Sequence, residues 1–246
     1  MTGQPSGKLV PLEQQSAPLR RKIIEALRSA VETGMLQPGQ RLVERDLCEQ
    51  LGVSRTSLRE ALRELQGDGI LSHSSRRGLV VSTISQDEAE NVYRIRAALE
   101  ALVVEQFIER ADEAEREQLA DEGRALEAAY RSRSVQRILT GKRAFYDRIC
   151  SGAKNALALD IISRLVLRTS ALRSRSLGRK DRQQESIREI EAILAAIEVR
   201  DVTAGRRAAI THVENAARYA LAPETEAGAA VDQRVQRLAL PGRSPT

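Results

Sequence analysis

Residues 54–65 read SRTSLREALREL, and this segment predicts a short amphipathic helix. Ser54 suits the N-cap, because its hydroxyl can accept a hydrogen bond from a backbone N–H of the first turn. Four apolar residues share the inward face at helical spacing: Leu58, Ala61, Leu62 and Leu65. Three arginines follow one another a turn apart: Arg55, Arg59 and Arg63. This row fits a solvated charged face, and it also fits a DNA major groove, where arginine pairs with guanine edges.

The segment before this helix favours the DNA interpretation. A helical pattern begins near Pro18 and ends at Thr33-Gly34, and a Pro-Gly turn follows at residues 37–40. A second short helix is predicted from Glu44 to Leu51, and Gly52 provides its C-terminal stop. Two short helices joined by a tight turn predict a helix-turn-helix whose second helix reads the DNA.

Two β-like runs come after the reading helix. Residues 70–72 and 79–81 flank a loop that carries Arg76, Arg77 and Gly78. This pattern predicts a hairpin wing with two arginines at its tip, because glycine permits the sharp bend. The sequence therefore predicts a winged helix-turn-helix domain over residues 16–82, preceded by a flexible arm of residues 1–15.

The chain changes character after Ser82. Helical patterns continue with few breaks at residues 85–110, 113–132, 135–151, 154–177, 181–200 and 202–221. No convincing strand interrupts them, so an all-α antiparallel bundle is predicted over residues 83–222 and the fold class is mainly α. Residues 223–246 are rich in Ala, Gly, Pro and Arg, and they predict a flexible tail.

The composition is consistent with a helical protein that binds a polyanion through a small number of positioned residues. The 246-residue chain has a net charge of +5, only 2% aromatic residues and no Trp, so aliphatic side chains must form the core. Basic residues are only slightly in excess, which argues against non-specific coating of nucleic acid. Cys48 and Cys150 lack metal-ligand spacing, and we expect two buried thiols rather than a disulfide.

Other classes of protein find little support. No signal peptide and no membrane-spanning apolar run is present, so we expect a cytoplasmic protein without membrane contact. The chain has two His, no plausible nucleophile–base pair and no Gly-rich phosphate loop. We therefore expect no enzymatic activity, with an enzyme built on a helical catalytic domain as a remote alternative.

The first domain resembles the GntR family of bacterial transcription regulators over essentially all of residues 18–82. The matching segments are LQPGQRL (36–42), ERDL (44–47), LGVSRTSLREAL (51–62), GIL (69–71), and Arg77-Gly78 with Val81. Ser57 departs from the proline of many members. The resemblance implies DNA contacts by Arg45, Ser54, Arg55, Thr56, Ser57, Arg59, Arg77 and Gly78. Arg63 and Arg76 are explained equally well by solvation or phosphate contact.

The second domain is similar to the FadR-type (FCD) effector domain of one GntR subfamily. The similarity lies in Arg96 with Leu99-Glu100, Phe145, Ser151-Gly152, Asn155, and the pattern from Ala204 to His212. It implies a homodimer that binds a pseudo-palindromic double-stranded DNA operator and senses a small, usually carboxylated, effector in the bundle. Our interpretation is a ligand-modulated repressor. The alternative is a DNA-binding protein whose helical domain dimerises without sensing.

This chain departs from the metal site of many FCD domains. The family's Asp and three His ligands align here with Lys142, Tyr146, Ile190 and His212. One histidine with a lysine, a tyrosine and an isoleucine cannot hold a divalent metal, so we expect no cofactor.

A hypothesis follows for the effector. Lys142 replaces the cation and pairs with a ligand carboxylate, Tyr146 and His212 donate hydrogen bonds to it, and Arg96 is a second anion anchor. The alternative is a degenerate pocket filled by side chains, with His212 an ordinary core histidine.

Overall fold

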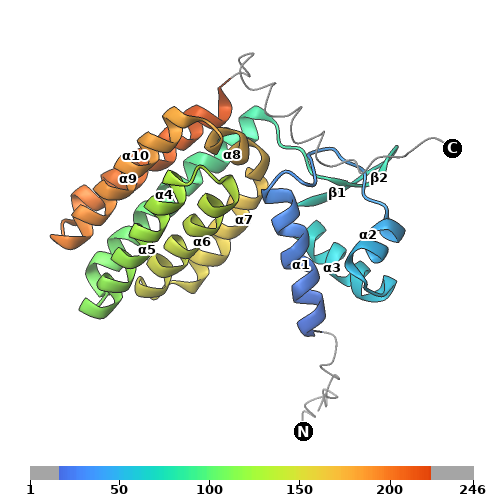
Figure 1. Cartoon of the computed structure of the whole chain (residues 1–246), viewed down its shortest axis with the longest axis horizontal. Coiled ribbons are helices and arrows are strands. Elements are labelled where there is room, and N and C mark those ends of the chain that lie inside the picture. The colour runs from blue at the N-terminus through green and yellow to red at the C-terminus, as the bar shows by residue number, and fades with distance from the viewer. Residues whose placement is uncertain (1–16, 223–246) are drawn as a thin grey trace, which may run out of the picture.

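The computed structural model describes residues 17–222. The flexible arm predicted for residues 1–15 and the flexible tail predicted for residues 223–246 lie outside the described residues. A head formed by residues 17–81 lies beside a helical bundle formed by residues 86–221 (Figure 1). This order confirms the predicted fold class, a winged helix-turn-helix followed by an all-α bundle.

The head contains three helices and one hairpin. These elements are α1 (Ala17–Glu32), α2 (Glu44–Leu51), α3 (Arg55–Gly67), β1 (Leu71–Ser74) and β2 (Gly78–Val81). The strands pair antiparallel, with Leu71 opposite Val81 and Ser74 opposite Gly78. Gly78 has a φ of 73°, which glycine adopts without strain, and the wing turns at this point.

The amphipathic pattern of α3 explains how the head packs. Leu58 and Leu65 are 0% exposed and Leu62 is 3% exposed, and all three lie in one apolar cluster with residues of α1 and the wing. Each buried leucine contributes about 1.5–3 kcal/mol relative to an exposed one. At the start of α3, Ser54 Oγ accepts a hydrogen bond from the Ser57 backbone N–H at 3.2 Å. The predicted N-cap is therefore present.

Seven helices make the described part of the bundle. They are α4 (Gln86–Arg110), α5 (Glu113–Arg131), α6 (Val135–Gly152), α7 (Ala156–Arg168), α8 (Ser170–Leu177), α9 (Lys180–Glu198) and α10 (Val202–Leu221). Side-chain caps set several starts: Ser85 caps α4, Asn155 caps α7 and Asp201 caps α10. None of the helices between residues 17 and 222 is long and apolar enough to cross a membrane.

The single helix predicted over residues 154–177 is wrong in one respect, because the chain breaks at Thr169. Thr169 has φ −104° and ψ 12°, and its hydroxyl donates to the Leu165 and Val166 carbonyls at 3.4 and 3.3 Å. The break separates α7 from α8, and α8 takes a new direction across the end of the bundle (Figure 1). Threonine is not a strong helix breaker, so the sequence carried no clear signal of this turn.

Aliphatic residues fill most of the bundle interior, with Phe107 and Phe145 among them. Gly205 lets α10 approach α4 closely, since a Cβ at this position would lie 2.6 Å from Ile108 Cδ1. Both cysteines are free thiols. Cys150 is buried as predicted, whereas Cys48 is only partly buried because it packs at the edge of the head's apolar cluster.

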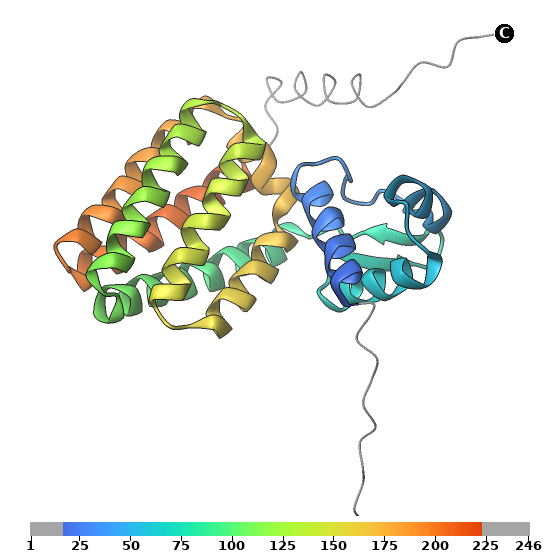
Figure 2. The same cartoon turned by 60° about the horizontal axis from the view of Figure 1, so that its bottom comes forward.

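The C-terminal end of α7 joins the bundle to the head. Leu167 is 6% exposed and belongs to the apolar cluster of the head. Asp68 pairs with Arg28 of α1 at 2.6 Å and lies 3.7 Å from Arg164 of α7. Arg168 of α7 also pairs with Glu88 of α4. Both views place α7 and α8 next to α1 (Figures 1 and 2), so the two domains share apolar and ionic contacts.

Candidate functional site

The predicted DNA-contacting arginines lie on the surface of the head. Arg45, Arg55, Arg59 and Arg77 are all exposed, and Thr56 is exposed beside them in the first turn of α3. Ser57 and Gly78 are partly exposed. Arg77 lies in the turn between β1 and β2, at the tip of the wing. These positions expose the arginines to a polyanion, although Arg45 pairs with Asp46 and Arg59 pairs with Glu44.

An ion pair within the head arranges part of this surface. Arg59 Nε donates to Glu44 Oε2 at 2.8 Å, which joins α3 to the first turn of α2. Arg45 follows Glu44 directly, so the reading helix and the predicted phosphate contact are neighbours. Both side chains of the pair are substantially exposed, so its contribution to stability is at most about 1 kcal/mol. The main effect of this ion pair is to orient the Arg59 side chain.

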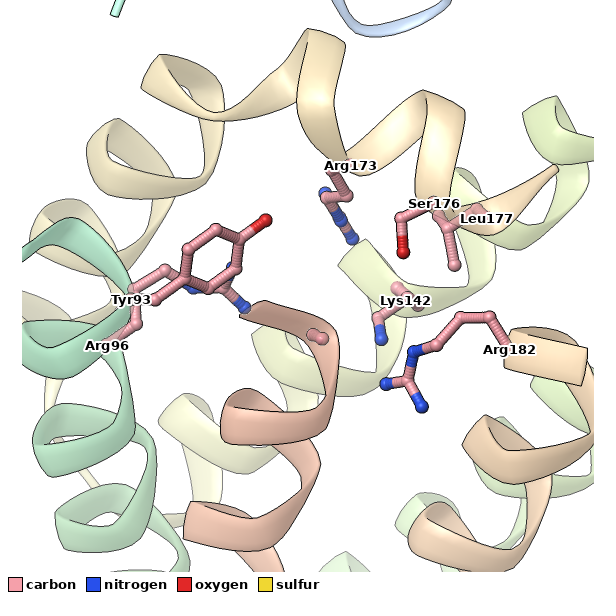
Figure 3. Close-up of a pocket in the computed structure, with 8 residues that line it drawn as sticks. Tyr93, Arg96, Lys142, Arg173, Ser176, Leu177 and Arg182 are labelled. Atoms are coloured by element: carbon pink, nitrogen blue, oxygen red, sulfur yellow. The ribbon is translucent and has the colours of Figure 1, made fainter. Parts of the chain in front are cut away.

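A second polar group of residues lies inside the bundle. The cavity there is lined by Tyr93, Arg96, Lys142, Arg173, Ser176, Leu177, Arg182 and Ala216 (Figure 3). Two predicted effector contacts, Arg96 and Lys142, line this cavity. The other two, Tyr146 and His212, are buried in contact with the lining residues rather than in the wall itself.

A chain of hydrogen bonds runs behind the cavity wall. Glu189 Oε2 lies 2.5 Å from His212 Nδ1, and His212 Nε2 lies 2.7 Å from Lys142 Nζ. Arg182 and Asn215 donate to the Glu189 carboxylate at 2.8 and 2.7 Å. Burial, and then the charges of Lys142 and Arg182, hold the pKa of His212 well below its usual value. His212 is therefore neutral, with its Nδ1–H donated to Glu189 and its Nε2 accepting from Lys142.

A second buried ion pair borders the cavity on α4. Arg96 is 2% exposed and donates to Glu100 Oε1 at 2.7 Å through Nη2, and its guanidinium lies 5.2 Å from the Tyr93 ring centroid. Among the described residues, the buried Tyr93 Oη has no hydrogen-bond partner, whereas the Tyr146 hydroxyl and the Glu100 carboxylate interact with each other. A buried polar atom without a partner costs about 1–3 kcal/mol, so Tyr93 Oη favours a site that receives another polar group.

The positive charge of the cavity comes from arginines. Burial first, and then Arg173 and Arg182, hold the pKa of Lys142 well below its usual value, and Glu100 acts in the opposite direction. Lysine loses its proton under such conditions, whereas arginine keeps its own. The cavity is small. The centre of a water molecule can move within about 10 Å³ of it, so the cavity holds one water molecule. A larger guest therefore requires the wall to move.

Two known families match the chain. Residues 19–81 match "Bacterial regulatory proteins, gntR family", and residues 91–215 match "FCD domain". The chain belongs to the GntR family, with an FCD domain. This confirms the resemblance inferred from the sequence.

Curated GntR relatives include two informative ones. The chain is 38% identical over 89 residues to the uncharacterized HTH-type transcriptional regulator YdhC of Bacillus subtilis, covering 36% of this chain and 40% of YdhC. It is 25% identical over 197 residues to the HTH-type transcriptional repressor RspR of Escherichia coli, covering 80% and 86%. The matches to the first three relatives span 40%, 58% and 64% of their lengths, which is less than two thirds.

Solved structures of GntR proteins share the fold. Escherichia coli McbR/YncC superposes with a TM-score of 0.71 at 22% identity, over 88% of this chain and 98% of that one. A putative GntR regulator from Rhodococcus sp. RHA1 superposes with a TM-score of 0.68 at 23% identity, over 85% and 100%.

The residues of this GntR protein do not fit the metal site of the FCD resemblance. Lys142 Nζ occupies the side of His212 Nε2 that a metal would take, and His212 Nδ1 is engaged by Glu189. Ile190 faces the apolar core of the bundle. Within residues 17–222, no group of three or more His, Cys, Asp or Glu is placed to hold a metal ion.

Sequence reasoning missed three residues of the cavity region: Arg173, Arg182 and Glu189. The alignment pointed to Ile190, one residue past the carboxylate that contacts His212. Arg182, Ser186 and Glu189 recur at spacings of four and three on a buried face of α9, and all are less than 9% exposed. This spacing of polar residues on a core-facing side was the signal in the sequence for a buried polar site. The sequence around Arg173 carried no such signal, because the direction of its side chain depends on the helix break at Thr169.

The buried Lys142 should make the stability of the protein depend on pH. In the unfolded chain Lys142 binds a proton at neutral pH, whereas its folded pKa is lowered, so the unfolded state binds more protons. Stability should therefore rise with pH towards the unfolded pKa. We expect the melting temperature of wild type to rise more than that of Lys142→Met between about pH 7 and pH 9.

The exposed Lys154→Met variant serves as the control and should keep the wild-type pH slope. The melting temperatures of all three proteins at each pH are measured by circular dichroism. Equal slopes for wild type and Lys142→Met would show that the folded lysine remains charged.

Proposed function

We propose that this GntR protein is a homodimeric repressor that binds a pseudo-palindromic DNA operator. On this proposal, a small carboxylate-bearing metabolite in the bundle modulates operator binding, no metal takes part, and the protein works in the cytoplasm without enzymatic activity. The observation that carries the proposal is a DNA-reading head joined to a bundle that buries several cations around one cavity.

The surface of α3 supports the DNA contacts. Arg55 and Arg59 project from the first two turns of the helix, where arginine can pair with guanine in the major groove. Arg45 and the N-terminal backbone of α3, held by the Ser54 cap, suit phosphate contacts. Arg77 and Gly78 place a basic wing tip for the minor groove.

The arginines of the cavity support recognition of an anion. Arg96 and Arg182 are each paired with a buried glutamate, and Arg173 has no carboxylate within ion-pair distance among residues 17–222. A ligand carboxylate at Arg173 would neutralise that charge and could accept hydrogen bonds from it. Tyr93 and Ser176 add hydroxyl groups to the same wall.

The small size of the cavity favours the second candidate function, a bundle that dimerises without sensing. Side chains leave space for only one water molecule, as a filled, degenerate pocket would. The unpartnered buried hydroxyl of Tyr93 argues the other way, because a permanently filled pocket gains nothing from it. A metabolite that releases DNA would separate the two functions.

Arg59 should contribute to sequence-specific DNA binding. Duplexes selected from a random pool by the full-length protein supply the probe. Loss of a bidentate contact to guanine weakens binding by about 1–3 kcal/mol, so we expect Arg59→Ala to bind the selected duplex more weakly and with relaxed base preference. Fluorescence anisotropy at fixed salt measures the affinities.

Arg188→Ala removes the same charge from the exposed surface of α9 in the bundle and should bind as wild type does. Equal affinity of Arg59→Ala and wild type for selected and scrambled duplexes would refute the assignment.

Small carboxylic acids should stabilise the protein and weaken its operator binding. Because no carboxylate among residues 17–222 neutralises Arg173, its guanidinium can pair with the acid. We therefore expect Arg173→Gln to bind the active acid at least about tenfold more weakly. Arg207→Gln, an exposed change on α10, should leave affinity unchanged. A thermal-shift screen followed by titration of the DNA complex measures both effects, and divalent metal ions should produce neither. Acids without any effect on melting or DNA binding would leave the non-sensing function.

One face of α4 supports the homodimer. Ile95 and Leu102 are 50% and 36% exposed and lie seven residues apart, so they share one side of the helix. A second copy would cover this apolar face and place two heads on a two-fold operator.

We expect Ile95→Glu with Leu102→Glu to yield monomers by light scattering, because the charges oppose burial. Leu157→Glu, a similar change at a 70% exposed leucine of α7, should stay dimeric; monomeric wild type would refute the proposal.

A further inference from the structure

Lys142 is unusual among the lysines of residues 17–222. Lys22, Lys154 and Lys180 are exposed, whereas Lys142 is 3% exposed and lines the cavity. Its Nζ lies 2.7 Å from His212 Nε2 and 3.4 Å from Tyr130 Oη. Within the described residues, no carboxylate forms an ion pair with it. A buried lysine without a carboxylate partner is costly to keep charged.

The surroundings of Lys142 make its amine a nucleophile. The ionisable groups that face it come from six helices: Arg96 and Glu100, Tyr130, Tyr146, Arg173, Arg182 and Glu189, and His212. Three of these are arginines, and neighbouring cations together with desolvation activate lysine as a nucleophile. His212 Nε2 accepts a hydrogen bond from Nζ, and Glu189 fixes the ring through Nδ1.

From this geometry we propose that Lys142 forms a reversible Schiff base with a small 2-oxo acid, whose carboxylate is held by the cavity arginines. The inference rests on the proposed function, because it names the class of metabolite that the cavity would receive. It assigns the positive charge of the site to the arginines and covalent chemistry to Lys142. The bound effector is then recognised by two groups, the carboxylate and the adjacent carbonyl.

The proposed reaction balances without an oxidant or a cofactor. The Lys142 Nζ lone pair attacks the carbonyl carbon, and His212 Nε2 relays one Nζ proton to the carbonyl oxygen to give a neutral carbinolamine. His212 then relays the second Nζ proton to the hydroxyl, which leaves as water as the C=N bond forms and the C–O bond breaks. One carbonyl and one amine thus give one imine and one water. The arrangement of Glu189, His212 and Lys142 matches a nucleophile, its base and an orienting carboxylate.

Other lining residues suit the same ligand. Tyr93 Oη is buried and lacks a partner among the described residues, so it can donate to the carbonyl oxygen or the carbinolamine hydroxyl. Arg173 and Ser176 come from α8, which forms one wall of the cavity (Figure 3). Because the cavity has space for one water, entry of an oxo acid requires its lining to rearrange. A shift of α8 would also move Leu177, which is 3% exposed and belongs to the apolar core of the bundle.

Borohydride trapping tests the proposal on the full-length protein. Sodium borohydride reduces an imine to a stable secondary amine, and peptide mass mapping then identifies the lysine. With pyruvate as the probe, we expect the reduced adduct at Lys142 to exceed that at Lys154 or Lys180. A lowered pKa raises the neutral fraction of a lysine, so the adduct at Lys142 should exceed that at the exposed lysines several-fold.

Matched compounds and variants separate the two recognition elements. Lactate, which has the carboxylate but no ketone, should give no adduct. Lys142→Arg should lose the adduct while it keeps the wild-type circular dichroism spectrum. Arg173→Gln should reduce trapping of pyruvate several-fold more than trapping of propionaldehyde, which has no carboxylate, because Arg173 both lowers the Lys142 pKa and binds the carboxylate. An equal fall with both compounds would show that Arg173 does not bind the carboxylate.

The outcomes distinguish this inference from the proposed function. If 2-oxo acids shift melting and DNA binding but leave Lys142 unmodified, the Schiff base is refuted and carboxylate sensing stands. Equal labelling of Lys142 and the exposed lysines also refutes the Schiff base. If neither oxo acids nor other carboxylates shift melting or DNA binding, and no adduct forms, both proposals fail.

Discussion

The burial of cations inside an aliphatic bundle is the constraint on which the second domain depends. Arg96, Lys142 and Arg182 are each less than 4% exposed, and an uncompensated buried charge costs several kcal/mol. Glu100 and Glu189 form ion pairs with the two arginines, and His212 accepts a hydrogen bond from Lys142. Most of the other inward residues of these helices are apolar. The polar cluster therefore fixes how α4, α6, α9 and α10 are rotated against one another.

This arrangement explains why Lys142 is compatible with the fold where a metal ligand would stand in the family. His212 keeps a partner on both nitrogens, and Glu189 keeps three donors, from Arg182, Asn215 and His212. A metal would add a charge beside Arg182, whereas a lysine with a lowered pKa can be present as a neutral amine. Lys142 in place of the family's aspartate is thus consistent with the arginines around the cavity.

The sequence predicted the head better than the cavity, and the reason lies in the range of the interactions. The Ser54 cap, the leucines of α3 and the Gly78 turn act over a few residues, so local patterns were sufficient. The cavity collects residues from helices far apart in the chain. Arg96, Lys142, Tyr146 and His212 were found through the family resemblance. Glu189 was missed by one position, because no local rule says which residue of α9 meets His212.

The junction between the domains follows from the one break that the sequence did not predict. Thr169 separates two short helices with different neighbours: α7 sends Leu167 into the apolar cluster of the head, and α8 sends Arg173 to the cavity. A ligand changes a conformational equilibrium only by binding one state better than the other. A guest larger than one water favours a state in which the lining of the cavity has rearranged. Because α7 and α8 are consecutive and Leu167 of α7 lies in the apolar cluster of the head, a rearrangement that moves α8 would reach the head through α7.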